Sequence, residues 1–422
     1  MKIFAFASLF LSLVLHAGHF TSTEALAAVP STKKSSGGYD YPSLYDESIP
    51  MLWTSKLVYS FATLLKAGRE GKLDLGNTFP PEVLELYKEE RLDVRGLDGE
   101  NGLSFTKVVE IVRANADYLQ ENNIGGDFTT SIIEKLLAVE DADKSSDSLF
   151  LETFASIEQA TQCVYGVVKD IVNKRVTVVF RGSTDLSTRD WQTNLSAQLV
   201  GLRTPKLLED SLEGRLKDRL LVHRGFYNYI FSNSRADGDQ RYDMILDDIK
   251  PLVEQEGYKL YVTGHSLGAA LSSVLAFKLA GSDKPWIPKP VTCISYASPL
   301  VGTKGFRTAF TLLEKMGLIR YLRITNFNDL VPTIPPFSLG CTRRTFKHVG
   351  INLRIYDKKF ILSHPNSNGW GIVNALRNSI FKPLCCALKE HGLQLHEKRM
   401  DAHKDALENM TLEDLYADEK LV

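Results

Sequence analysis

The spacing of apolar residues divides the chain into a helical first part and a mixed second part. Between residues 46 and 155, apolar side chains recur three and four positions apart, for example in LVYSFATLLKAG and FTKVVEIVRANADYLQENN. This period places apolar residues along one face of a helix. The pattern therefore predicts a helical N-terminal region over residues 46–155 that packs on the later domain or covers it.

β-rich runs alternate with helical segments over residues 156–422. The segment QCVYGVVKDIVNKRVTVVFRGS predicts two strands around the polar turn Lys169–Lys174, and VTCISYASP and LIRYLRITNFND predict further strands. Such alternation implies an α/β fold, with a mostly parallel central sheet and helices on both of its faces. The charged segment KRMDAHKDALENMTLEDLYADEK predicts an amphipathic, solvated C-terminal helix.

The beginning of the chain has the three-part pattern of a secretory signal. Lys2 supplies a positive charge, Ile3–Leu15 is an apolar run, and Ala25–Ala27 offers a small-residue cleavage site. The apolar run is shorter than the roughly 20 residues that a membrane-spanning helix needs. We expect residues 1–27 to be removed and residues 28–45 to form a flexible lead-in, so that the mature protein is secreted or enters the secretory-pathway lumen.

The composition narrows the classes of function. Of the 422 residues, 44% are hydrophobic, which suffices for one large core or a core with a smaller subdomain. The net charge of -1 shows no basic excess, so no nucleic-acid partner is expected. Sequons at Asn194 and Asn409 offer glycosylation sites in a secreted protein. The odd number of cysteines leaves at least one unpaired, and their spacing fits no zinc site, so we expect no metal and no cofactor. The cysteines are Cys163, Cys293, Cys341, Cys385 and Cys386.

One short motif carries the strongest chemical signal. Leu260–Thr263 predicts the end of a strand, the sequence GHSLG follows at Gly264–Gly268, and a helix comes next. A G-x-S-x-G motif between a strand and a helix is typical of a nucleophile elbow, in which small residues let the two elements approach. The start of the helix directs free N–H groups toward a developing oxyanion. We therefore predict Ser266 as the nucleophile, the backbone N–H of Leu267 as an oxyanion donor, and a structural role for His265.

A serine nucleophile needs a histidine base and an acid that orients this histidine. In this type of fold the chain order is serine, acid, histidine, so both partners are expected after Ser266. Asp329 directly follows the predicted strand YLRITN, and the C-terminal ends of strands are where α/β sheets place active-site groups. Asp329 is therefore the predicted acid, and Asp283 and Asp357, in polar turns, are weaker alternatives.

The histidine base is less determined by spacing. A late histidine in a loop before a helix fits best, which favours His391 or His396 without choosing between them. The other histidines after the elbow are His348, His364 and His403.

Five motifs follow one another along the chain: VVFRGS (178–183), VHRGF (222–226), VTGHSLGAA (262–270), YASPLVG (296–302) and NDLVPTIP (328–335). In this order they resemble the class 3 lipases, the family of the fungal triacylglycerol lipases. The resemblance implies an α/β-hydrolase fold that cleaves acyl esters without a metal ion. On the same basis, Ser266 is similar to the nucleophile, Asp329 to the triad acid, and Ser183 to a second oxyanion donor that acts through its backbone N–H and hydroxyl.

The resemblance also bears on the choice of base. His348, in FKHVG, looks like a family histidine that follows the acid motif and is not the base. The base of the family usually opens an H-x-x-x-x-Y segment. Here the segment EHGLQLH fits, with His396 at the position of the usual tyrosine. The resemblance therefore implies His391 as the base and keeps His396 as the alternative.

These features predict a secreted serine carboxylester hydrolase, most simply a lipase that hydrolyses acylglycerols through an acyl-enzyme. Its partner is then a lipid ester at a lipid–water interface, with transient contact to a membrane or lipid-droplet surface. Residues 184–221, with interspersed apolar and polar positions, predict a lid over an apolar acyl site. The alternatives are a phospholipase A1 or galactolipase acting on polar lipids, an esterase for small or cell-wall esters, and a catalytically inactive lipid-binding hydrolase fold.

Overall fold

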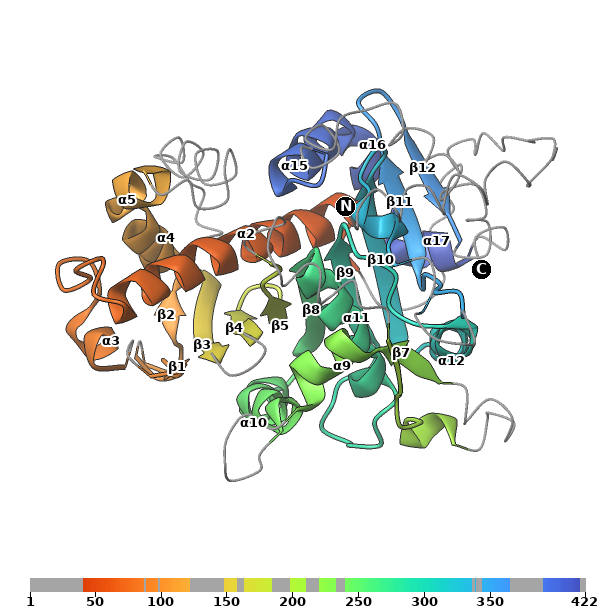
Figure 1. The fold of residues 1–422 in the computed structure, drawn as a ribbon, viewed down its shortest axis with the longest axis horizontal. Helices are drawn as coiled ribbons and strands as arrows, with labels where there is room; N and C mark the ends of the chain where they lie inside the picture. Colours follow the sequence, from red (N-terminus) through yellow and green to blue (C-terminus); the bar gives the residue numbers. More distant parts are fainter. Residues whose placement is uncertain are drawn as a thin grey trace, which may run out of the picture. The chain divides into compact units, whose positions relative to one another are not determined.

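The computed structural model describes the chain in ten ranges and a single residue (Figure 1). Several predicted segments lie outside the described residues: the signal sequence, residues 28–40 of the lead-in, and residues 184–197, with Asn194, and 210–219 of the lid. The described residues are 41–86, 89–97, 99–121, 148–157, 163–183, 198–209, 220–232, 240–335, 338, 344–364 and 390–417.

A ten-stranded sheet forms the centre of the described part of the chain. Its strand order is β1-β3-β4-β5-β8-β9-β10-β11-β12, with β2 also paired to β3, and β6 and β7 form a separate two-stranded sheet. The strands are β1 (Arg91–Asp93), β2 (Leu103–Ser104), β3 (Leu149–Ile157), β4 (Cys163–Asp170), β5 (Arg175–Phe180), β6 (Leu199–Gly201), β7 (Leu221–His223), β8 (Lys259–His265), β9 (Val291–Tyr296), β10 (Ile319–Asn326), β11 (Ile351–Ile355) and β12 (Phe360–Ser363).

The middle of the sheet is parallel and both edges are antiparallel. Strands β5, β8, β9, β10 and β11 pair in parallel. The pairs β3–β4, β4–β5 and β11–β12 are antiparallel. The prediction of a mostly parallel sheet is therefore correct only for the middle strands. The turn between β4 and β5, at residues 171–174, falls where the sequence predicts it. It is far too short for the crossover that parallel pairing needs, so these two strands pair antiparallel.

The region predicted to be helical also contributes strands β1, β2 and β3 to the sheet. The predicted boundary between residues 155 and 156 falls inside β3, so the two predicted regions share one sheet. Strand β3 is buried on both faces and therefore lacks the polar–apolar alternation that marks a strand in a sequence. The helices of this region are α2 (Leu44–Arg69), α3 (Pro81–Leu86), α4 (Phe105–Ala114) and α5 (Ala116–Glu121).

Helix α2 is enclosed on most sides by other elements. Ser43 caps its start by accepting a hydrogen bond from the backbone N–H of Asp46 at 3.1 Å, so the helix begins inside the predicted lead-in. The helix contacts strands β4, β5, β8 and β9. It also contacts helix α4 and the C-terminal helices α15 (Leu393–Ala402) and α16 (Lys404–Glu408). Buried residues around nearly its whole circumference, rather than along one stripe, are typical of such an enclosed helix.

Helices cover both faces of the sheet, as the sequence predicts. Along β5, Val178 belongs to the core that also contains residues of α11, whereas its neighbour Val179 belongs to the core that contains residues of α2. Successive side chains of a strand point to opposite faces, so α2 and α11 lie on different faces of the sheet. Helices α9 (Arg224–Phe231), α10 (Arg241–Val253), α11 (Leu267–Ala280) and α12 (Lys304–Lys315) share the second face. None of the described helices combines the length and the apolar character that crossing a membrane requires.

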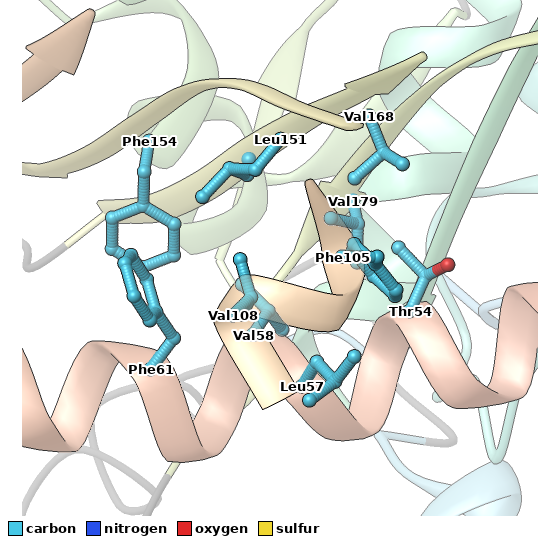
Figure 2. A pocket seen from close by; sticks show the side chains of 11 residues that line it. Thr54, Leu57, Val58, Phe61, Phe105, Val108, Leu151, Phe154, Val168 and Val179 are labelled. Atoms are coloured by element: carbon cyan, nitrogen blue, oxygen red, sulfur yellow. The ribbon is translucent and has the colours of Figure 1, made fainter. Parts of the chain in front are cut away.

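A small apolar cavity of about 20 Å³ lies in the core beside α2. Figure 2 shows side chains from α2, α4 and the strands β3–β5 around it, among them Val58, Phe61, Val108, Phe154 and Val179. No titratable side chain lines this cavity, so we regard it as a packing feature of the core.

The C-terminal segment forms three short helices that are partly buried, not one solvated helix. Lys56 of α2 and Glu397 of α15 form an ion pair of 2.6 Å, and their side chains are only 0% and 4% exposed. Met400 and Leu407 lie in a core shared with α2, β10 and β11. The prediction of a solvated helix is wrong because these apolar and paired charged residues face other elements. The helices are α15 (Leu393–Ala402), α16 (Lys404–Glu408) and α17 (Leu412–Ala417).

Candidate active site

Ser266 lies at the sharp turn between β8 and α11. Its backbone φ of 58° falls in a region that few residues other than glycine adopt. A Cβ on Gly264 would come within 2.6 Å of the carbonyl carbon of Gly268, and a Cβ on Gly268 within 2.2 Å of the carbonyl oxygen of Phe180. Both glycines are therefore needed for this turn. Helix α11 begins at Leu267, whose N–H lies in the first turn, where backbone N–H groups lack an acceptor within the helix.

The segment that follows β5 lies directly beside this turn. A Cβ on Gly182 would come 2.5 Å from the carbonyl oxygen of His265 and 3.2 Å from the Cβ of Ser266. Ser183 is the next residue in the chain and is partly buried. The predicted second oxyanion donor, Ser183, therefore directly follows a residue whose backbone lies against Ser266.

Asp329 is buried just beyond the end of β10, with 3% of its surface exposed. One carboxylate oxygen accepts a hydrogen bond from the backbone N–H of Val331 at 2.9 Å. The other lies 2.9 Å from Nδ1 of His391. Strands β8, β9 and β10 run in parallel, so their C-terminal ends, and with them Ser266 and Asp329, lie at the same edge of the sheet.

His391 binds Asp329 through one ring nitrogen only. A carboxylate accepts hydrogen bonds, so Nδ1 is the donor and Nε2 is left as the nitrogen that accepts a proton. Within the described residues, Nε2 of His391 and Oγ of Ser266 are both buried without a hydrogen-bond partner. The ring centroid of His391 lies 4.5 Å from that of His265, the residue before Ser266. The arrangement thus places an oriented imidazole beside the serine turn.

The alternative histidines make other contacts. His396 is fully buried, and its Nδ1 lies 3.0 Å from Nδ2 of Asn326. Nε2 of His348 lies 2.6 Å from the carbonyl oxygen of Pro332, and burial lowers the pKa of His348 well below its usual value. Asp329 therefore bonds to His391 and to none of these histidines in the described contacts.

The alternative acids lie at the surface. Asp357 forms an ion pair of 2.8 Å with Arg399, and its side chain is 78% exposed. Asp283 is exposed as well. Neither makes a described contact with a histidine, so Asp329 is the acid that the geometry supports.

Two further histidines, His265 and His396, lie near His391 and are neutral at neutral pH. Burial lowers the pKa of His265 well below its usual value, and the neighbouring His391 and His396 add to this effect. Burial also lowers the pKa of His396 to about 4. At neutral pH, neither ring carries a charge that competes with His391 for the carboxylate of Asp329.

The loop that carries His391 is held from two sides. Nδ2 of Asn326, the last residue of β10, donates to the carbonyl oxygen of Glu390 at 2.8 Å. Nε2 of His265 lies 2.8 Å from the carbonyl oxygen of His391 itself. Sequence reasoning missed the role of Asn326, because a single asparagine at a strand end carries no pattern.

The described residues contain no cluster of three histidine, cysteine, aspartate or glutamate side chains suited to a metal ion. Cys163 and Cys293 are buried free thiols. Residues 198–209 and 220–221 of the predicted lid contain β6 and the start of β7. The rest of that segment lies outside the described residues, and the lid stays a prediction.

Comparison with known proteins identifies the region that contains the serine turn. The family model of lipase (class 3) matches residues 177–339, which include Ser266 and Asp329. Residues 177–339 belong to the class 3 lipase family. The resemblance that the sequence motifs imply is confirmed, and members of the class 3 lipase family are ester hydrolases. The mixed sheet, with helices on both faces and the serine turn after β8, is the α/β-hydrolase fold.

The class 3 lipase region is similar to plant lipolytic proteins. The chain is 36% identical over 178 residues to "Phospholipase A1-II 6" of Oryza sativa subsp. japonica, which covers 38% of this chain and 40% of that protein. It is 28% identical over 215 residues to "Galactolipase DONGLE, chloroplastic" of Arabidopsis thaliana, covering 44% of this chain and 42% of that protein. The matches thus span less than half of these curated relatives.

Solved structures of fungal lipases are also similar to the chain. The triacylglyceride lipase of Rhizomucor miehei has 22% sequence identity and a TM-score of 0.39, covering 55% of this chain and 80% of that one. A triacylglycerol lipase from Penicillium expansum has 20% identity and a TM-score of 0.39, covering 51% of this chain and 74% of that one.

Proposed function

We propose that the protein is a serine-dependent carboxylester hydrolase that cleaves acyl esters of glycerolipids. The observation that carries the proposal is the 2.9 Å hydrogen bond between His391 and Asp329, formed beside the strained turn at Ser266. All three residues are at most 3% exposed, so the reacting groups are shielded from bulk water, which strengthens their electrostatic interactions. The class 3 lipase region supports ester hydrolysis as the reaction.

In the proposed reaction, Nε2 of His391 takes the proton of Ser266 while Oγ attacks the carbonyl carbon of the ester. Asp329 holds the imidazole in orientation and stabilises its protonated form. The tetrahedral intermediate then collapses, the bond to the alcohol oxygen breaks, and His391 gives its proton to the departing alcohol. Water attacks the acyl-enzyme by the same route, which releases the fatty acid and regenerates Ser266.

Two backbone segments are proposed to stabilise the oxyanion of the intermediate. The N–H of Leu267 lies at the start of α11, where the helix dipole also favours negative charge. Ser183 follows Gly182, whose backbone lies against Ser266. Preorganised donors of this kind are each worth about 3–4 kcal/mol of transition-state stabilisation.

Polar membrane lipids are the first substrates to test. Curated relatives that are similar to the chain carry the names phospholipase A1 and galactolipase, which favours phospholipids and galactolipids over the acylglycerols that the sequence motifs suggest. Triacylglycerols are the second candidate class, because the matching family is that of the class 3 lipases.

A substrate panel with the purified protein tests the proposal. It contains phosphatidylcholine, a galactolipid, tri-, di- and monoacylglycerols, and a short aryl ester, and the blank is Ser266→Ala. We expect fatty acid release by the wild type, none above background by Ser266→Ala, and covalent labelling of Ser266 by a fluorophosphonate. Failure of the wild type on every ester, together with no labelling, would show an inactive hydrolase fold.

The site of action is also proposed. The signal pattern of residues 1–27 supports secretion, and Asn194 and Asn409 would then be glycosylated; Asn409 is exposed. N-terminal sequencing of protein from a secreting host is expected to begin after Ala27.

We further propose that the enzyme works at a lipid–water interface, with the lid opening there. This predicts a rise in activity where the substrate exceeds its solubility limit, and a smooth saturation curve would count against a lid.

A further inference from the structure

Three segments that lie far apart in the chain meet at the ring of His265. Tyr59 belongs to α2, and its hydroxyl lies 3.1 Å from Nδ1 of His265. On the other side of the ring, Nε2 lies 2.8 Å from the backbone carbonyl oxygen of His391. Gly182, in the segment before Ser183, packs against the hydroxyl of Tyr59.

The chemistry of these groups sets the direction of each hydrogen bond. A carbonyl oxygen only accepts, so Nε2 of His265 carries the proton. The ring is buried and neutral, which leaves Nδ1 as an acceptor for the hydroxyl of Tyr59. A series of hydrogen bonds therefore runs from Tyr59 through His265 to His391, and its Tyr59 end packs against Gly182.

Close packing keeps this series in one geometry. A Cβ on Gly182 would lie 2.2 Å from the hydroxyl oxygen of Tyr59 and 2.5 Å from the carbonyl oxygen of His265. Position 182 therefore has no room for a side chain, and the backbone of Gly182 packs against both groups. The rings of His265 and His391 also lie against each other, with centroids 4.5 Å apart.

We propose that Tyr59 and His265 are positioning residues for the ester hydrolysis proposed above. His265 holds the main chain of His391 and Asp329 holds its side chain, so both parts of this residue are fixed. Tyr59 ties the same unit to Gly182 and hence to the oxyanion segment at Ser183. Neither Tyr59 nor His265 needs to contact the substrate. The inference rests on the proposed function, and it gives helix α2 a part in aligning the base with the oxyanion donors.

Kinetics of one variant and a matched control test the role of Tyr59. Tyr59→Phe removes one hydroxyl, and we expect kcat on an aryl ester to fall about tenfold, since loss of one hydrogen bond and a small misplacement suffice for that. KM is expected to stay within about twofold, because no substrate contact is lost. Tyr45→Phe is the control: Tyr45 lies on the same helix and its hydroxyl bonds to Asp401 at 2.8 Å, so its loss leaves kcat unchanged.

Rescue by a conservative variant separates positioning from packing. His265→Gln keeps an N–H donor at a reach close to that of Nε2, whereas His265→Leu keeps only bulk. We expect His265→Gln to retain at least about tenfold more activity than His265→Leu. Equal kcat for Tyr59→Phe and wild type, or equal loss in both His265 variants, would overturn the proposal.

A spectroscopic measurement tests the geometry without any substrate. In protein containing histidine labelled with the NMR-active nitrogen isotope, His265 is expected as the neutral tautomer with its proton on Nε2 at near-neutral pH. The assignment comes from the signal that His265→Gln lacks. Tyr59→Phe is expected to shift the Nδ1 signal, and Tyr45→Phe is not. A proton on Nδ1 would refute the arrangement, even if ester hydrolysis is confirmed. If the protein hydrolyses no ester, this measurement still judges the hydrogen bonds, so the two failures are distinguishable.

Discussion

Asp329 and His391 are 62 positions apart in the chain and share a hydrogen bond of 2.9 Å. The backbone N–H of Val331 binds the second carboxylate oxygen of Asp329, so the turn after β10 orients the carboxylate. The imidazole of His391 therefore meets a carboxylate that is already held in place. This hydrogen bond determines how activity is expected to respond when either side chain is replaced.

Replacing Asp329 by asparagine is expected to keep the fold and remove most of the activity. The amide is close in shape to the carboxylate but neither holds the productive tautomer of His391 nor stabilises its protonated form. From the comparable change in serine proteases, kcat is expected to fall about 10⁴-fold. Steady-state kinetics on an aryl ester measures this, with near-UV circular dichroism as the control for folding. A loss of less than about tenfold would mean that another acid orients the base.

The choice between His391 and His396 is tested by changing each of them. His391→Ala is expected to lower kcat by at least about 10³-fold, because the serine then has no base. Nδ1 of His396 lies 3.0 Å from both Nδ2 of Asn326 and the carbonyl oxygen of Gly392. His396→Asn places an amide there that can both donate and accept, and activity is expected to stay within about tenfold of the wild type. Kinetics of the two purified variants gives the answer. The reverse ranking would assign the base to His396.

The hydroxyl of Ser183 is expected to contribute to oxyanion stabilisation. Ser183→Ala keeps the backbone N–H and loses only the hydroxyl, so kcat is expected to fall about 10²-fold with little change in KM. Ser183→Thr keeps a hydroxyl and is the matched control, expected to lose less. If the alanine and threonine variants have equal kcat values, the hydroxyl plays no part.

The buried His396 makes stability dependent on pH. Its pKa is about 4 in the folded protein and 6.5 in a model peptide, so the unfolded chain binds the proton more readily. The free energy of unfolding is therefore expected to rise with pH between about 4 and 6.5 and to level off above, with His396 contributing up to about 3 kcal/mol.

His265 and His348 act in the same direction, because burial lowers the pKa of each of them. Urea unfolding at a series of pH values measures the effect. His396→Asn is expected to show a shallower pH dependence than the wild type, and an unchanged slope would contradict the assignment.

The ion pair between Lys56 and Glu397 is expected to be important for stability. Lys56→Met leaves a buried carboxylate without its partner and is expected to cost about 3–5 kcal/mol. The double variant Lys56→Met/Glu397→Met removes both charges and is expected to recover most of this loss. Urea unfolding provides the free energies. The exposed pair Lys66–Glu70 on the same helix is the control, and Lys66→Met is expected to cost less than about 1 kcal/mol.

Local sequence was sufficient to predict the serine turn. The strand end, the two glycines and the helix that begins at Leu267 are neighbours in the chain, so the geometry around Ser266 follows from a short segment. The same holds for the strands β4 and β5, whose apolar runs and polar turn are contiguous. Asp329 was predictable for a related reason, since the end of a strand in an α/β sheet is a recognisable place.

Contacts between distant segments account for what the sequence left open or predicted wrongly. Strand β3 reads as part of a helical region because it is buried on both faces, and pairing with β4 is what makes it a strand. The C-terminal helices are charged in sequence, yet partners such as Lys56 bring those charges into the interior.

The base shows the same division. Spacing left His391 and His396 equal, and only the folded chain brings Asp329 to one and Asn326 to the other. The sequence by itself was sufficient to predict the turn at Ser266, the order in which serine, acid and histidine follow one another, and the resemblance to the class 3 lipases, because these depend on short motifs along the chain. The tertiary structure decided which histidine meets the acid and that Tyr59 of α2 reaches the serine turn, because hydrogen bonds across 62 to 206 positions exist only after folding.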